Sequence, residues 1–149
     1  MALDLDLEVK TIRNAPIFTG IDPCKMKLLA CMSEQITFEK GDFLFRCGEI
    51  PDAAYVILKG EVEFLAQTGE GISTIGQDGP GAMIGEVAIL CDAKRFTSAR
   101  ALTPLSVMRI NKDCLLRMIQ DSPQFSLSIA KELARRVMQV AKHEGIHAH

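Results

Sequence analysis

The chain has 149 residues, with 17 basic and 19 acidic side chains and a formal net charge of −2. Hydrophobic residues make up 48% of it, which is enough to fill the core of one ordinary domain. The balanced charge excludes a strongly basic nucleic-acid-binding module. No apolar run approaches the roughly 18 residues that cross a bilayer. We therefore expect a single domain that makes no direct contact with DNA or membrane.

The N-terminus and the cysteines indicate the compartment. Residues 1–6 lack the basic stretch that begins a secretory signal peptide, so a cytoplasmic location is expected. The cysteines are odd in number and include no Cys-x-x-Cys pair, which disfavours a disulfide framework or a structural zinc site. We expect them to be small buried apolar side chains. They are Cys24, Cys31, Cys47, Cys91 and Cys114.

Two helices are expected near the N-terminus. The first covers residues 7–14 and ends before Pro16, because proline disfavours helix at the preceding residue. Asp22 is an N-cap and Pro23 the first helical residue of the second. The apolar face of this second helix contains Met26, Leu29, Ala30 and Met32.

From residue 36 to residue 110 short apolar runs alternate with turn signals at roughly ten-residue spacing, which is typical of an all-β sandwich or barrel. About eight strands predict a double-stranded β-helix, or jelly roll, so the fold class is mainly β with flanking helices. Met83 and Ile84 are expected to pack inside the barrel. The expected strands are Ile36–Phe38, Phe43–Phe45, Ala54–Leu58, Val62–Leu65, Ile72–Ile75, Ala99–Ala101 and Leu105–Ile110.

Two further helices are expected at the C-terminal end. Asn111 is a good N-cap for a helix over residues 112–120, and Pro123 starts a long helix that runs to about Glu144. Arg135 and Arg136 are expected on its solvated face. Its narrow apolar stripe could pack on the barrel or on the same helix of a second subunit, and we favour the second. The stripe consists of Ala130, Leu133, Val137 and Val140.

A candidate site lies in residues 85–90 and at Arg95, nine residues after Glu86. Gly85 lets the backbone approach a ligand closely, and a helix that begins at Glu86 points free N–H groups at an anion. Arg95 supplies a planar positive charge that suits a phosphate, and Glu86 can accept hydrogen bonds from sugar hydroxyls. The alternative is that Arg95 and Glu86 form a salt bridge that caps a loop.

The residues around three turn glycines, Gly41, Gly48 and Gly60, resemble the cyclic-nucleotide-binding domain family over residues 40–49 and 52–62. Gly85–Glu86 with Arg95 looks like the phosphate-binding cassette of that family. Residues 133–137 resemble the dimerisation helix of its catabolite-activator branch. The resemblance covers roughly residues 12–144 and implies a single domain over 1–149, with the barrel at about 36–110 and the C-terminal helices at about 112–144.

The resemblance implies a regulatory ligand, cyclic AMP or cyclic GMP, and no metal. Arg95 would pair with the cyclic phosphate, and Glu86 would hold the ribose 2′-hydroxyl. The backbone N–H groups of Gly85 and Glu86 would assist, and Thr97 or Ser98 would add a hydroxyl. The implied ligand-binding residues are Gly85, Glu86, Val87, Ala88, Arg95, Phe96, Thr97 and Ser98.

This sequence departs from the family pattern at several positions. Lys94 stands where a proline is common, and Phe96 follows the arginine where the family has a small residue. Val140 and Ala141 lie where the catabolite activator offers hydroxyls to adenine. These departures keep open a second interpretation, an interaction or dimerisation module that has the same fold and binds no cyclic nucleotide.

The function that these patterns predict is regulation of an effector protein through movement of the C-terminal helices, in a homodimer joined by the long helix. In the transcription-factor branch a helix-turn-helix would follow that helix, whereas only residues 145–149 follow it here. We therefore expect either a stand-alone regulatory subunit or a protein that acts through a partner. An enzyme is not expected, because His143, His147 and His149 are all terminal and no catalytic or metal-binding set can include them on the barrel.

Overall fold

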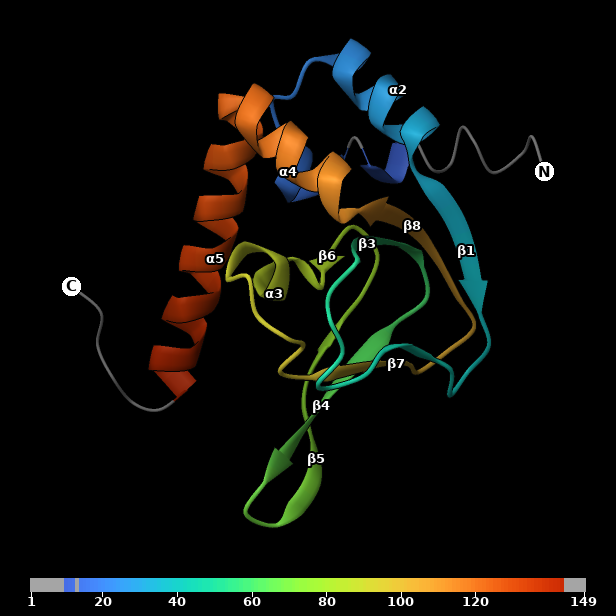
Figure 1. Ribbon diagram of the computed structural model, residues 1–149, viewed down its shortest axis with the longest axis vertical. Coiled ribbons are helices and arrows are strands. Elements are labelled where there is room, and N and C mark those ends of the chain that lie inside the picture. Colours follow the sequence, from blue (N-terminus) through green and yellow to red (C-terminus); the bar gives the residue numbers. More distant parts are fainter. Residues whose placement is uncertain (1–9, 13, 144–149) are drawn as a thin grey trace.

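A computed structural model describes residues 10–12 and 14–143 of the chain. Figure 1 shows a β barrel with α2 and α4 over one end and α5 along one side. The elements in chain order are η1 (Pro16–Phe18), α2 (Pro23–Met32), β1 (Glu34–Phe38), β2 (Phe43–Phe45), β3 (Ala53–Lys59), β4 (Val62–Thr68), β5 (Gly71–Asp78), β6 (Met83–Ile84), α3 (Glu86–Leu90), β7 (Ser98–Ala101), β8 (Leu105–Asn111), α4 (Lys112–Asp121) and α5 (Pro123–His143).

The strands form two four-stranded antiparallel sheets, in the orders β1-β8-β3-β6 and β2-β7-β4-β5. The predicted jelly roll is therefore confirmed, with eight strands in the part of the chain that the structure describes. The sequence did not predict β6 as a strand. Ile84 packs inside the barrel as expected, whereas Met83 points the other way, into the core under the helices.

Strand β3 is buried on both faces, and this explains its unbroken apolar sequence. Successive side chains of a strand point to opposite sides of its sheet. Ala53, Tyr55 and Ile57 therefore contribute to the core between the two sheets. The alternate residues, Ala54, Val56 and Leu58, contribute to a second core beneath the helices. The helices are thus fixed to the outer face of the first sheet.

The helix boundaries follow the predicted caps. Asp22 accepts a hydrogen bond from the Cys24 N–H at 2.9 Å, and Asn111 accepts one from the Cys114 N–H at 2.8 Å. Both bonds satisfy backbone donors that the first turn of a helix leaves free. Residues 10–12 and 14 are helical, and the rest of the predicted first helix lies outside the described residues.

Gly60 shows why a turn glycine is needed between β3 and β4. Its φ is +96°, and a Cβ at this position would lie 2.4 Å from the carbonyl oxygen of Pro104. A side chain would therefore clash with backbone, which cannot move aside cheaply. Gly41 and Gly48 also have positive φ angles.

The expected burial of the cysteines is wrong for four of the five. Cys114 is buried, and the others are exposed free thiols. On α2 the buried residues are Met26 and Leu29, which turn Cys24 and Cys31 toward solvent on the opposite face. Small apolar character permits burial and does not enforce it.

Among the described residues, no helix has the length and apolar character needed to cross a membrane.

Candidate ligand-binding site

A cavity of about 800 Å³ lies between β5, α3 and α5. This volume is within the range of about 300–1,000 Å³ that is typical of small-molecule sites. Most of the wall is apolar, with polar groups at a few positions. The residues of the wall include Phe45, Ile75, Asp78, Gly85, Glu86, Val87, Ala88, Arg95, Phe96, Thr97, Leu133, Arg136, Val137, Val140 and Ala141.

Gly85 joins β6 to α3 and adopts a left-handed conformation with φ +80°. A Cβ on this residue would lie 2.8 Å from Nη1 of Arg95 and 3.1 Å from the ring of Phe45. Glycine is therefore required both by the backbone conformation and by the close approach of the arginine. Gly85 and Arg95 are therefore in direct contact, as their joint place in the sequence motif suggested.

Arg95 is buried, with only 3% of its surface exposed. Its Nη1 donates to the carbonyl oxygen of Gly85 at 2.5 Å, and Nη2 donates to that of Ala53 at 2.6 Å. The guanidinium also lies 4.1 Å from the centroid of the Phe45 ring. Burial lowers the pKa of the Arg95 guanidinium from its usual value.

No carboxylate in the described part of the chain lies within ion-pair distance of Arg95. The salt bridge with Glu86 that was the alternative interpretation of the motif is therefore not formed. A guanidinium has five N–H donors, so donors remain after the bonds to the two carbonyl groups. A buried cation without an acidic partner favours binding of an anion.

Glu86, at the start of α3, is 2% exposed. Its Oε1 accepts a hydrogen bond from Nη1 of Arg136 at 2.7 Å. Its Oε2 is buried and has no hydrogen-bond partner among the described residues. Burial raises the pKa of this carboxyl, although the nearby Arg136 acts in the opposite direction. An unsatisfied buried acceptor typically costs about 1–3 kcal/mol, so a ligand donor at Oε2 would relieve an existing cost.

The prediction that Arg136 lies on a solvated face is wrong. It reaches from α5 to Glu86 and also donates from Nη2 to the carbonyl oxygen of Met83 at 3.0 Å. The spacing of residues along the helix could have predicted that Arg136 faces the barrel. Phe125, Ile129 and Leu133 recur every four residues toward the core, and Arg136 follows three residues later on the same side.

The other arginine of the pair behaves as expected. Arg135 is exposed and forms an ion pair with Glu132 one turn earlier. Adjacent residues on a helix point about 100° apart, so the two arginines project differently. Arg136 reaches Glu86, whereas Arg135 borders the cavity with an exposed side chain.

The residues that follow Arg95 divide between the cavity and the surface. Thr97 is buried and lines the cavity, and Phe96 lines its rim with 61% of its surface exposed. Ser98 is not part of the wall, and its hydroxyl accepts a hydrogen bond from the Cys47 N–H at 2.9 Å. Val87 and Ala88 of α3 both line the cavity. Seven of the eight implied residues are thus brought together.

Asp78 also lines the cavity, and the sequence did not single it out. The alternation of side chains along β5 could have indicated its direction, but only once the pairing of β5 with β4 was known. In the described residues, no group of three or more histidine, cysteine or acidic side chains is placed to hold a metal ion.

Comparison with known proteins identifies related chains. The family model described as "Cyclic nucleotide-binding domain" matches residues 35–122. The "CRP-like cAMP-activated global transcriptional regulator" of Mycobacterium tuberculosis is 30% identical over 129 residues, which cover 85% of this chain and 57% of that protein. The "Cyclic AMP receptor protein" of Thermus thermophilus is 26% identical over 129 residues, covering 86% and 60%.

The solved structures show the same fold. The crystal structure of the Thermus thermophilus catabolite activator protein aligns with a TM-score of 0.78 and 24% identity, covering 87% of this chain and 62% of that one. The chain therefore spans less than two thirds of the length of the two curated relatives above.

Proposed function

The chain belongs to the cyclic nucleotide-binding domain family, and on that premise we propose that its cavity binds cyclic AMP or cyclic GMP as a regulatory ligand. The observation that carries the proposal is the buried, unpartnered Oε2 of Glu86 in the wall of the cavity. A ribose 2′-hydroxyl is a donor that would satisfy it. The buried Arg95, with no acidic partner in the described residues, supplies the charge that a cyclic phosphate needs.

The proposed contacts follow from these two residues. The free guanidinium donors of Arg95 and the backbone N–H groups of Gly85 and Glu86 hold the phosphate, and Thr97 adds a hydroxyl. Val87, Ala88 and Phe96 border the ligand. We assign Ser98 a supporting role, because its hydroxyl holds the neighbouring turn at Cys47 rather than facing the cavity.

The proposed output is movement of α5. Because Glu86 contacts both the proposed ribose position and Arg136 on α5, ligand binding changes the group that holds this helix. The ligand moves α5 only to the extent that it binds the two helix positions with different affinity. Val137 and Val140 are exposed and available for a homodimer contact through α5. We further propose that the signal passes to an effector protein and not to DNA directly, and that no reaction is catalysed.

The proposed setting is the cytoplasm. Support comes from the five cysteines, all of which are free thiols, as is usual where the environment is reducing.

The test is calorimetric titration of the purified protein with each cyclic nucleotide. We expect a dissociation constant near 1 μM, which corresponds to about −8 kcal/mol. Arg95→Lys should weaken binding by about a hundredfold, because an ammonium group cannot reproduce the planar pair of donors. Arg95→Ala is a poorer test, because it leaves two buried carbonyl groups without their donor.

Arg100→Lys is the matched control, because Arg100 lies on β7, five residues after Arg95, and pairs with Glu63 away from the cavity. It should bind the nucleotide as the wild type does. If neither nucleotide gives heat or a thermal shift with the wild type, the proposal is wrong, and the interaction module becomes the better account. That alternative is favoured by the apolar Val140–Ala141 pair, which offers a base no side-chain hydrogen bond.

A further inference from the structure

Asp78, the last residue of β5, points into the barrel. In the pairing of β4 with β5 it lies opposite Val62, a fully buried residue of the core between the sheets. The preceding Gln77 lies opposite Glu63, whose carboxylate bonds to Thr74 and Arg100. Because alternate residues of a strand share a face, Asp78 belongs to the inner face and reaches the cavity.

The carboxylate of Asp78 has no hydrogen bond or ion pair within the described part of the chain. Its charged surroundings are Arg135, Arg136 and Glu132 on α5, together with Glu86 on α3. Burial raises its pKa, and the attraction of Arg136 only partly opposes this. Asp78 is therefore a partly buried acceptor that the protein itself leaves unused.

The position of Asp78 relates it to one part of the proposed ligand. With the phosphate at Arg95 and the ribose at Glu86, the rest of the cavity extends toward β5 and α5. There the wall consists largely of apolar side chains, including Ile75, Val137 and Val140. Such walls suit the flat faces of a purine. Asp78 is the acidic side chain that the cavity wall presents beyond Glu86 on that side.

We propose that Asp78 reads the edge of the purine and gives the cavity a preference for guanine over adenine. This inference rests on the proposed function. An ionised carboxylate only accepts hydrogen bonds. Guanine offers two adjacent donors, N1–H and the N2 amino group, which match the two carboxylate oxygens. Adenine offers one amino group beside an N1 lone pair, and this lone pair would face the carboxylate.

The discrimination therefore has an attractive part and a repulsive part. The apolar Val140 and Ala141 of α5 cannot supply the hydroxyls that would favour adenine. Cyclic GMP is thus the expected ligand of this chain.

The experiment is calorimetric titration of the full chain with cyclic GMP and with cyclic AMP. The wild type should bind cyclic GMP about tenfold more tightly or better, since a good bidentate contact to a base gives roughly that discrimination. In Asp78→Asn and Asp78→Ala the ratio of the two dissociation constants should fall toward unity. Asp121→Asn, at the exposed end of α4, is the control and should keep the ratio of the wild type.

The outcomes separate this inference from the proposed function. Binding of both nucleotides with equal affinity, or a ratio that Asp78→Ala leaves unchanged, overturns the assignment of Asp78 alone. Tighter binding of cyclic AMP by the wild type also overturns it. Binding of neither nucleotide by the folded wild type overturns the proposed function and this inference together. Circular dichroism of each variant establishes that a lost signal is not lost folding.

Discussion

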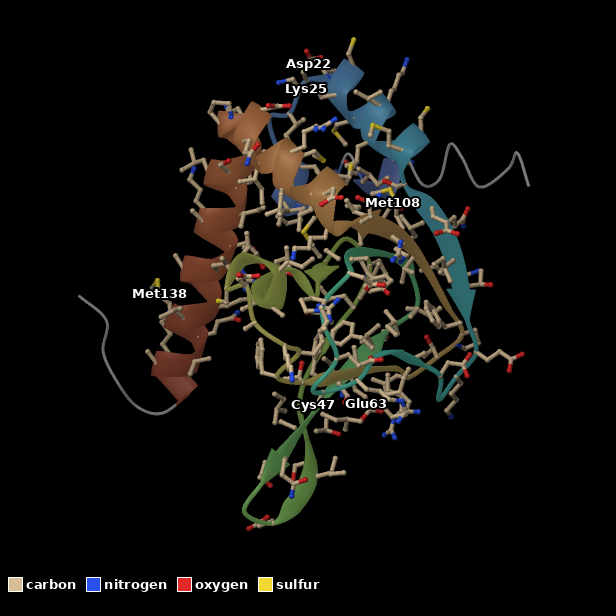
Figure 2. All side chains as sticks on the ribbon, in the orientation of Figure 1. Asp22, Lys25, Cys47, Glu63, Met108 and Met138 are labelled. Carbon is tan, nitrogen blue, oxygen red and sulfur yellow. The ribbon has the colours of Figure 1, made fainter. Side chains whose placement is uncertain are left out.

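The two halves of α5 are attached to the protein in different ways. Residues 123–133 are anchored by apolar packing, with Phe125 fully buried and stacked on Phe18 at 5.7 Å between ring centroids. In residues 134–142, Val137 and Val140 are 68% and 61% exposed. Figure 2 shows Met138 on the side of α5 that faces away from the barrel. In the described residues, the side-chain hydrogen bonds that join this second half to the barrel come from Arg136.

This difference indicates which part of α5 the proposed movement would involve. Burial of a large apolar side chain contributes about 1.5–3 kcal/mol to the stability of the fold, and this contribution does not depend on a ligand. The contact between Arg136 and Glu86 is polar, and one of its partners is the residue that we propose binds the ribose. In the proposed function, the first half of α5 is therefore the fixed base, and the second half is the part that ligand binding would reposition.

The largest expected effect is the loss of the anchor. Phe125→Ala should destabilise the protein by about 3–5 kcal/mol, because it removes a fully buried ring and leaves a cavity. Val137→Ala, in the exposed half of the same helix, should change stability by no more than about 0.5 kcal/mol. Equilibrium unfolding in urea measures both values. Similar losses for the two variants would mean that the halves are not attached differently.

A second expected effect concerns association. Val137→Asp places a charge on the exposed apolar side of the second half, so it should convert a dimer to a monomer while the domain stays folded. Sedimentation velocity distinguishes the two states. A wild type that is already monomeric at high protein concentration contradicts the dimer.

The smallest expected effect concerns Glu86 and pH. Burial raises the pKa of Glu86 in the folded state, so the unfolded chain ionises first as pH rises. The unfolded state then binds fewer protons, and stability is lost as pH rises from the usual value of 4.5 through the folded pKa. Glu86→Gln cannot ionise and escapes this loss. The variant should melt about 3 °C higher than the wild type near neutral pH. A shift of this size corresponds to a gain of about 1 kcal/mol in the free energy of unfolding.

The same comparison near pH 4 is the control, because the wild-type carboxyl is then largely protonated in both states and the gain should shrink. A variant that melts lower than the wild type at neutral pH would mean that the ion pair with Arg136 outweighs the cost of burial.

Much of the fold could be predicted from the sequence, because its signals are local. The caps at Asp22 and Asn111 and the turn glycines act within a few residues. The spacing of apolar residues, every second residue in the strands and every three to four in the long helix, then predicts these elements. Burial of the cysteines was not predictable in this way, since it depends on which face of a helix or turn meets the core.

The site was predictable where it is contiguous and missed where it is not. Gly85, Glu86 and Arg95 lie within one short motif, and the structure brings them together. Arg136 lies 50 residues from Glu86, so its role depends on the rotation of α5 against the barrel. The direction of the Asp78 side chain depends on how β5 pairs with β4. A shift of this register by one residue would turn Asp78 to the other face of the sheet.

The measurement that tests the account most directly is amide hydrogen exchange along α5, with and without saturating cyclic nucleotide. Exchange reports local opening segment by segment. We expect exchange to slow in residues 134–142, where the ligand changes the surroundings of the Arg136 contact, and to stay unchanged in residues 123–133. Equal slowing in both halves, or no change in either, would contradict the claim that the ligand acts on the second half of this helix.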